Sequence, residues 1–209
     1  INDWSTNKLI TNIVKMGEGS PFLNLDSVKI AIDNLKNKDG LEYGRTRITV
    51  STVGVGIKKG DIDAIEWAAK ELDVYLAWSL HSSIPKHRSK IMPINDKYSI
   101  ESLIPQLKKY YDQTKLPIFI EWICLEENMS EEHAKELIKI MKKVPSKLNL
   151  IEFNPLANKD FKPASKEKID KFSKMIQDNG FLSLFRRSRG RDINASCGSL
   201  ANKKSVVNE

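Results

Sequence analysis

Short apolar runs alternate along this chain with segments of helical periodicity, and this alternation restricts the fold more than any other feature. The runs at Val74–Leu80, Ile118–Leu125 and Leu148–Phe153 are nearly continuous, and Arg47–Val53 is rich in β-branched residues. Such runs are typical of parallel strands that are covered on both faces by helices. Strands that alternate with helices form βαβ units. The sequence therefore predicts an α/β fold, built either as a barrel or as an open doubly wound sheet.

The segments between these strands have the spacing of amphipathic helices. In residues 26–36, for example, apolar side chains recur three and four positions apart. Pro105 lies inside one such pattern, which predicts a kink or an early end of that helix. Further strands are predicted at Ile10–Lys15 and Phe181–Phe185. Helices are predicted at residues 26–36, 61–72 and 99–110, and from Ser130 and Ser165 onward.

The size and composition of the chain indicate a folded protein with one sizeable core. It has 209 residues, of which 40% are hydrophobic and 29% are charged, and these values are typical of soluble globular domains. Two small domains are the alternative. The sequence contains no apolar run of membrane-spanning length and no recognisable signal peptide, so we expect a cytoplasmic location, with an organellar one as the alternative. The first residue is not methionine, which leaves room for an upstream segment.

Positive charge is concentrated near the C-terminus. The chain has a formal net charge of +7, and the stretch from Arg186 to Lys204 has six basic residues against one acidic residue. A basic patch of this kind suggests a polyanionic partner, most often nucleic acid. The alternative is that the charge run is only a solvated surface.

One cysteine follows the arginines of this tail. Cys197 lies between Ser196 and Gly198, whose small side chains leave the sulfur accessible, and nearby guanidinium groups favour the thiolate. The pattern suggests a nucleophile, with an incidental thiol in a surface loop as the alternative. Cys124 lies in an apolar strand and is interpreted as a buried small hydrophobe. Two isolated cysteines provide neither a disulfide framework nor a metal site by themselves, so we predict no metal ligand in this sequence.

Small polar residues follow four of the predicted strands. In α/β folds, the loops at the carboxyl ends of the strands converge on one face and form the ligand site. The pattern therefore predicts a site for a polar small molecule, although the same residue types are also common simply as turn formers. These residues are Gly17–Ser20, Ser51, Thr52, Ser79, His81 and Asn154.

Several common motifs fit poorly or are missing. Gly54–Gly56 follows a strand, but Gly60 comes one residue late for a dinucleotide-binding fingerprint. The sequence has no Walker A motif, zinc-protease motif or nucleophile elbow. His133 is interpreted as a surface or core-edge residue of a helix, and His81 as a structural residue behind a strand. Glu121 lies in an otherwise apolar strand, where it either lines a barrel interior or pairs with a basic residue.

Six stretches form an ordered set: Ile13–Asn24, Ile48–Gly54, Trp78–Ser82, Arg88–Asn95, Asn149–Pro155 and Asp192–Gly198. Together they resemble the radical S-adenosylmethionine (radical SAM) RNA methyltransferases that act on carbon 2 or carbon 8 of adenine, the RlmN/Cfr group. Each stretch alone is weakly specific, whereas six in the same order, ending on a cysteine, are strongly specific. The likeness covers essentially the whole chain.

The resemblance implies a partial (β/α) barrel, TIM-like and of the radical SAM type, over residues 1–185, followed by a basic segment at 186–209. It also implies that strand-end loops bind S-adenosylmethionine (SAM) beside a [4Fe–4S] cluster whose ligands are not in this chain. The positions that match the family's cofactor contacts are Gly19, Ser20, Ser51, Ser79, Leu80, His81 and Asn154.

The resemblance further implies a radical reaction. Cys197 matches the cysteine that one SAM molecule methylates, while a second SAM is cleaved reductively to a 5′-deoxyadenosyl radical. That radical takes a hydrogen from the S-methyl group, and the methylene radical adds to adenine. Arg186, Arg187 and Arg189 are expected to bind RNA phosphates. We therefore predict a monomeric RNA adenine-C2 methyltransferase that acts on ribosomal RNA, with transfer RNA as an additional substrate and flavodoxin as an example of its electron donor.

Two departures from the family pattern are visible. Where the family reads Gly-Glu-Pro, this chain has Gly19-Ser20-Pro21, with a glutamate displaced to Glu18, so we expect weaker binding of the cofactor's amino group. The family's CxxxCxxC motif is absent from the sequence. We therefore expect this stretch to be the C-terminal portion of a longer enzyme and to be inactive alone. A truncated, non-catalytic RNA-binding relic is the alternative.

Overall fold

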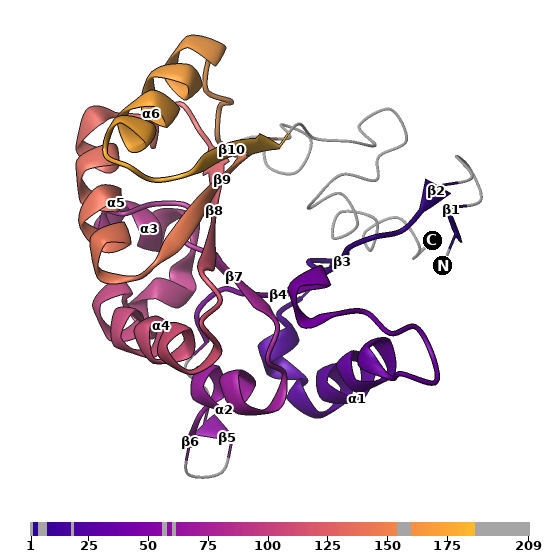
Figure 1. The fold of residues 1–209 in the computed structure, drawn as a ribbon. Helices are drawn as coiled ribbons and strands as arrows, with labels where there is room; N and C mark the ends of the chain where they lie inside the picture. Colours follow the sequence, from indigo (N-terminus) through magenta and orange to yellow (C-terminus); the bar gives the residue numbers. More distant parts are fainter. Residues whose placement is uncertain are drawn as a thin grey trace, which may run out of the picture.

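The computed structural model describes residues 2–3, 8–17, 19–55, 58–59, 62–153 and 160–186. Its centre is a six-stranded parallel sheet in the order β10-β9-β8-β7-β4-β3. The sheet curls into an open half-barrel, as Figure 1 shows. The prediction of a partial (β/α) barrel is confirmed. The strands are β3 (Ile13–Lys15), β4 (Ile48–Thr52), β7 (Tyr75–Ser79), β8 (Ile118–Cys124), β9 (Ser146–Glu152) and β10 (Ser183–Arg186).

Helices connect successive strands of the sheet, and most of them lie along its outer, convex side (Figure 1). Two short antiparallel pairs also occur, β1 (Asn2–Asp3) with β2 (Lys8–Leu9) and β5 (Lys58–Lys59) with β6 (Ile62–Asp63). Short 3-10 turns are η1 (Pro21–Leu23), η2 (Arg45–Arg47) and η3 (Pro93–Asp96). The helices are α1 (Leu25–Lys36), α2 (Ala64–Glu71), α3 (Pro85–Ile91), α4 (Ile100–Thr114), α5 (Glu131–Lys143) and α6 (Lys166–Asp178).

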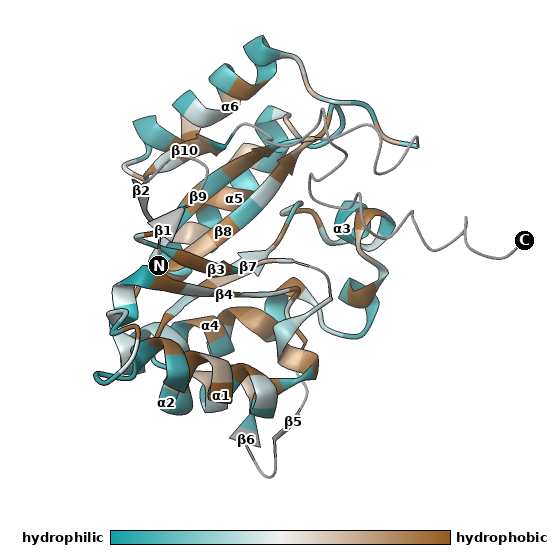
Figure 2. Cartoon of the chain, turned by 90° about the vertical axis from the view of Figure 1, so that its right-hand side faces the viewer, coloured by the Kyte–Doolittle hydropathy of each residue, from teal (hydrophilic) through white to brown (hydrophobic). Residues whose placement is uncertain are grey.

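The core lies between the sheet and this helical layer. Hydrophobic and hydrophilic residues alternate along the helices in Figure 2, as expected for helices with one buried side. In β8, the Trp122 ring is fully buried, and its centroid lies 5.4 Å from that of Phe172 in α6. Because successive side chains of a strand point to opposite faces, Glu121 and Ile123 face the other, concave side. The concave side is therefore the face on which a ligand site can form.

Serine side chains define the starts of three helices. Ser99, Ser130 and Ser165 each precede a helix, and each side chain accepts a hydrogen bond from a backbone N–H of the first turn. Such N-caps satisfy donors that a helix cannot pair internally. The sequence predicted all three of these helix starts correctly.

The helix that contains Pro105 does not end early. Helix α4 continues for 15 residues and ends only at Thr114, after which Lys115 adopts the left-handed conformation with φ of 58°. Of the two alternatives for Pro105, a kink or an early end, the early end was wrong because the buried stripe of α4, which includes Leu107 and Tyr110, continues on both sides of the proline. In addition, the Tyr110 hydroxyl donates to the Val74 carbonyl at 2.5 Å. Tertiary packing therefore outweighs the one backbone hydrogen bond that a proline removes.

A glycine is required at the end of β4. Gly54 has φ of +87°, and a Cβ at this position would lie 2.4 Å from Cδ1 of Leu103 and 3.2 Å from Nε1 of Trp78. Both the left-handed backbone and the close approach of α4 exclude a side chain here. The glycine thus serves the turn between sheet and helix.

Candidate functional site

Predicted ligand-binding residues meet at one edge of the sheet. Strands β3, β4 and β7 are adjacent and parallel, so the segments that follow them leave the sheet on the same side. The predicted residues in this part are Gly19, Ser20, Ser51, Ser79, Leu80 and His81. The structure therefore brings together predicted positions from three strands. Asn154, Cys197, Arg187 and Arg189 lie outside the described residues.

The loop after β3 is open beside its glycine. Gly19 has φ of +73°, and no atom lies within 4 Å of where a Cβ would stand. The neighbouring Ser20 hydroxyl is buried and has no hydrogen-bond partner among the described residues. A buried polar atom without a partner is costly, and a polar ligand would satisfy it. Ser51, by contrast, donates from Oγ to the Lys15 carbonyl at 2.9 Å and joins β4 to β3.

A buried arginine holds the end of β7. Arg88, from α3, has 0% exposure. It donates from Nε to the Leu80 carbonyl at 3.1 Å, and from Nη2 to the carbonyls of Ser79 at 3.3 Å and Val53 at 3.0 Å. Its Nη1 donates to Asn95 Oδ1 at 2.8 Å. Burial lowers the pKa of Arg88 to about 10, so the guanidinium remains charged at neutral pH. One side chain thus connects the ends of β4 and β7.

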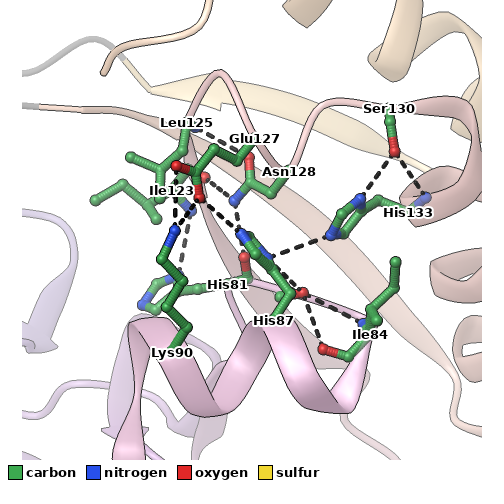
Figure 3. A network of polar contacts seen from close by, with 11 residues as sticks. His81, Ile84, His87, Lys90, Ile123, Leu125, Glu127, Asn128, Ser130 and His133 are labelled. Atoms are coloured by element: carbon green, nitrogen blue, oxygen red, sulfur yellow. Dashed lines mark hydrogen bonds and ion pairs between the residues drawn. The ribbon is translucent and has the colours of Figure 1, made fainter. Parts of the chain in front are cut away.

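A buried asparagine holds the next carbonyl along the chain. Asn128 has 0% exposure, and its Nδ2 donates to the carbonyls of His81 and Ile123 at 2.8 Å each. Its Oδ1 accepts from the Leu125 backbone N–H at 3.0 Å. These contacts are visible in Figure 3. Together, Arg88 and Asn128 bind the three consecutive carbonyls of residues 79–81, and this segment is therefore rigidly held. Sequence reasoning assigned no role to either side chain, because no local pattern shows which carbonyls each of them binds.

The tautomer of His81 follows from its hydrogen bond. The residue has φ of +57°, and its Nδ1 accepts from the Ile123 backbone N–H at 3.1 Å. Burial, and to a lesser degree the charge of Arg88, lower the pKa of His81 to about 4. The ring is therefore neutral at pH 7 and carries its proton on Nε2. His81 can offer one N–H donor to a ligand without adding charge.

The other two histidines form a network behind this segment, shown in Figure 3. His87 lies in α3, with Nδ1 3.0 Å from Ser82 Oγ and Nε2 3.2 Å from Glu127 Oε2. His133 Nε2 lies 3.3 Å from His87 Nδ1, and its Nδ1 lies 2.8 Å from Ser130 Oγ. Burial, followed by the charge of His87, lowers the pKa of His133 to about 4. His133 is only 5% exposed, so it belongs to the buried part of its helix and supports the loop after β7.

The concave face carries one buried acid–amide pair. Glu121 in β8 is 3% exposed, and its Oε1 accepts from Asn149 Nδ2 of β9 at 2.9 Å. Its Oε2 is buried and has no hydrogen-bond partner among the described residues. Burial raises the pKa of Glu121, whereas the bond from Asn149 and the charge of Arg186 act in the opposite direction. Glu121 therefore lines the interior of the half-barrel, as one of its two interpretations held.

Two further predicted residues occupy distinct environments. Cys124 is 1% exposed, and burial raises the pKa of its thiol to about 12, so its interpretation as a small buried residue is confirmed. Arg186 ends β10 with an exposed side chain, and its Nη1 lies 3.7 Å from Met16 Sδ.

A cavity of about 560 Å³ between α6 and the ends of β8 and β9 is lined partly by Cys124 and Phe185. The described cofactor-site residues do not line it.

The described residues fit SAM but not a metal cluster. The open loop at Gly19, the unpaired Ser20 hydroxyl and the neutral donor of His81 suit a polar ligand with hydrogen-bond acceptors and donors. Within the described part of the chain, no three His, Cys, Asp or Glu side chains gather in a way that could hold a metal ion. An iron–sulfur cluster thus has no ligand set among these residues.

Two comparisons identify the family. The chain is 40% identical over 201 residues to a probable dual-specificity RNA methyltransferase RlmN of Flavobacterium psychrophilum, covering 95% of this chain and 56% of that protein. Its fold matches the crystal structure of a radical SAM methyltransferase from Sphaerobacter thermophilus with a TM-score of 0.85 and 33% identity, covering 93% of this chain and 56% of the other. The chain belongs to the radical SAM RNA methyltransferase family. It spans about half the length of these two relatives.

More distant structures share the radical SAM fold. A domain of the pyruvate-formate lyase-activating enzyme from Bacteroides vulgatus has a TM-score of 0.63 and 13% identity, covering 84% of this chain and 98% of that domain. No protein-family model matches the chain.

Radical SAM methyltransferases use SAM and a [4Fe–4S] cluster. Among the described residues, no helix is both long enough and apolar enough to cross a membrane.

Proposed function

We propose that this chain is part of a cytoplasmic enzyme that methylates carbon 2 of an adenine in ribosomal RNA, with transfer RNA as a second substrate class. The observation that carries the proposal is the junction of β3, β4 and β7. There, residues that match the cofactor contacts of RNA methyltransferases come together from three strands, in a chain 40% identical to an RlmN protein. The Ser20 hydroxyl without a partner gives this junction an unsatisfied polar group that a ligand would complete.

The geometry of the described residues supports a role for each of them. Gly19 leaves space for the ligand to approach the backbone, and Ser20 provides a hydroxyl beside it. His81 donates from Nε2 while remaining uncharged. Ser51 and Ser79 lie on the concave face within the same junction, and Asn154 is proposed as a further contact. Bound SAM would supply the methyl group and, after one-electron reduction, the radical chemistry of the family.

We further propose that Cys197 carries the methyl group and that the neighbouring arginines bind RNA. Cys197 is the better nucleophile of the two cysteines on sequence grounds, because arginines precede it and small residues flank it. Cys124 is excluded from this role, since its thiol is buried and its pKa is raised to about 12. Arg186, Arg187 and Arg189 would contact phosphates, which position the RNA without reading its sequence.

The test is methylation by the enzyme that contains this chain, with its iron–sulfur cluster reconstituted. Cys197→Ala should abolish adenine methylation, measured by mass spectrometry of digested RNA, while reductive cleavage of SAM continues. Cys124→Ala is the matched control and should leave methylation intact. Unchanged methylation in Cys197→Ala would refute the assigned role of this cysteine.

One observation favours a second candidate, an RNA-binding protein without methyltransferase activity. Ser20 stands where the family usually has glutamate, which removes a negative group expected to bind the amino group of SAM. RNA binding by the chain together with no detectable binding of S-adenosylhomocysteine would support this candidate. Binding of S-adenosylhomocysteine at micromolar concentration would instead support the enzyme.

A further inference from the structure

The carboxylate of Glu121 is placed as a binding group that none of the predicted contacts includes. Only 3% of Glu121 is exposed, yet its Oε2 has no hydrogen-bond partner among the described residues. A buried acid without a full set of partners is strongly unfavourable. A simple core position would not require an acid at all. The arrangement therefore suggests that another molecule supplies the missing donor.

The neighbours of Glu121 show which face of the sheet this donor must reach. The register pairs Ser79 of β7 with Glu121, and Glu121 with Asn149 of β9. Paired residues on adjacent parallel strands share one face and lie about 5 Å apart. Trp122, the next residue, packs against α6 on the opposite face. Glu121 therefore faces the concave side, in the same row as Ser79.

Asn149 orients the carboxylate. Its Nδ2 donates to Oε1 at 2.9 Å, which leaves Oε2 as the free acceptor. The charge of Arg186 also acts on Glu121 and opposes the effect of burial on its pKa. Because positive charge is already supplied at this side, a neutral hydrogen-bond donor suits Oε2 better than a second cation does.

We propose that Glu121 accepts a hydrogen bond from a ribose hydroxyl of the adenosyl group, with Asn149 as its positioning residue. The inference rests on the proposed function, in which the ligand is SAM. The loop at Gly19 and Ser20 follows β3, which is separated from β8 by β4 and β7. A ligand whose amino-acid end lies at this loop extends its nucleoside across β4 and β7 toward β8. Carboxylates that accept from ribose hydroxyls are a recurrent solution in nucleotide sites.

The closing experiment compares two ligands on two variants of the full chain by isothermal titration calorimetry. The probes are S-adenosylhomocysteine and its 2′,3′-dideoxy analogue, which lacks both ribose hydroxyls. Glu121→Gln should weaken binding of S-adenosylhomocysteine by about tenfold to 100-fold, the size expected for a lost bond to a charged acceptor. It should change binding of the dideoxy analogue by less than about threefold. Glu126→Gln removes the same charge from an exposed position after β8 and should affect neither ligand.

Each outcome separates the inference from the proposed function. If the unaltered chain binds neither ligand, the proposed cofactor site fails, and the inference fails with it. If it binds S-adenosylhomocysteine and Glu121→Gln binds it equally well, only the inference is refuted. An equal loss for both ligands would show that Glu121 supports the fold and does not bind the ribose. Selective loss for the ligand with hydroxyls is the supporting result, and circular dichroism of each variant verifies that it is folded.

Discussion

At the scale of single residues, burial decides the protonation of two histidines. His133 is 5% exposed and contacts Ser130 and His87 through its two ring nitrogens. Burial, together with the charge of His87, lowers its pKa from 6.5 to about 4. His81 has a similarly lowered pKa because of burial and the charge of Arg88. Both rings are therefore uncharged in the folded protein at pH 7, and protonation of either ring opposes folding.

The stability of the chain should accordingly depend on pH between about 6.5 and 4. In this window the unfolded state binds protons that the folded state does not, so the free energy of unfolding falls as the pH is lowered. One unit of pKa difference corresponds to about 1.4 kcal/mol, and His133 alone could therefore contribute up to about 3 kcal/mol. Urea denaturation at several pH values measures this dependence.

His133→Gln should make the same pH profile flatter. Of the two histidines whose pKa is lowered, only His81 then remains to contribute to the pH dependence. His87→Gln, which removes the neighbouring ring but keeps His133, provides the comparison for loss of the contact itself. A profile of His133→Gln as steep as that of the original chain would contradict the assigned role of burial.

At the scale of elements, α3 fastens the ends of two strands through one side chain. Arg88 binds three carbonyls, of Val53, Ser79 and Leu80, while Asn95 accepts its remaining bond. The Ser79 carbonyl ends β7, and the other two belong to the residues that follow β4 and β7. A planar group with several fixed donors can span them, whereas an ammonium acts as a single point of contact. The arginine thus sets the backbone geometry at Ser79 and Leu80, which are among the proposed cofactor-binding residues.

Arg88→Lys should therefore weaken binding of S-adenosylhomocysteine at least about tenfold, although it keeps the positive charge. Two or more buried carbonyls would lose their donors, at about 1 to 3 kcal/mol each. Calorimetric binding and urea denaturation measure the two effects. Lys86→Met removes a charge from an exposed position of the same helix and should change neither. Unaltered ligand affinity in Arg88→Lys would show that the bonds of Arg88 to the three carbonyls do not shape the binding site.

The turn after β4 provides a second prediction at this scale. Gly54→Ala should destabilise the chain by about 2 to 4 kcal/mol, because φ of +87° is strained for alanine and the new Cβ would collide with Leu103 of α4. Gly17→Ala is the matched control, since nothing lies within 4 Å of a Cβ there. Chemical denaturation compares the two. Equal stability of both variants would contradict the close packing of α4 against this turn.

At the scale of the whole molecule, charge is distributed unevenly. The net charge is +7, and the basic excess between Arg186 and Lys204 accounts for most of it. If this tail binds RNA phosphates, association should weaken steeply with salt, because bound cations are released from the RNA. Neutralising Arg186, Arg187 and Arg189 to glutamine should reduce the slope of log K against log salt by about 2 for single-stranded RNA. Fluorescence anisotropy at several salt concentrations measures it.

A triple variant of exposed lysines on α6, Lys166, Lys171 and Lys174 to glutamine, controls for net charge alone. Its slope should stay close to that of the original chain. Equal changes in the two triple variants would mean that the tail has no specific role in RNA binding, and that the positive charge of the molecule acts as a whole.

The sequence by itself determined the order of the six strands of the sheet, the described helices other than α3, and the family, because these depend on local periodicity and on ordered short motifs. It predicted no helix at α3. It also indicated the strand ends as the place of the proposed site. It left open whether Pro105 kinks or ends α4, since the full length of that helix depends on packing along the whole buried stripe.

Only the tertiary structure decided which side chains complete the proposed site. The Glu121–Asn149 pair joins residues 28 positions apart, the Asn128–His81 bond joins residues 47 apart, and Arg88 reaches back 35 positions to Val53. No local pattern encodes such partners, because strand register and sheet order bring them together. The buried acid that looked unexplained in the sequence acquires an orientation, and a proposed ligand, only when β7, β8 and β9 lie side by side.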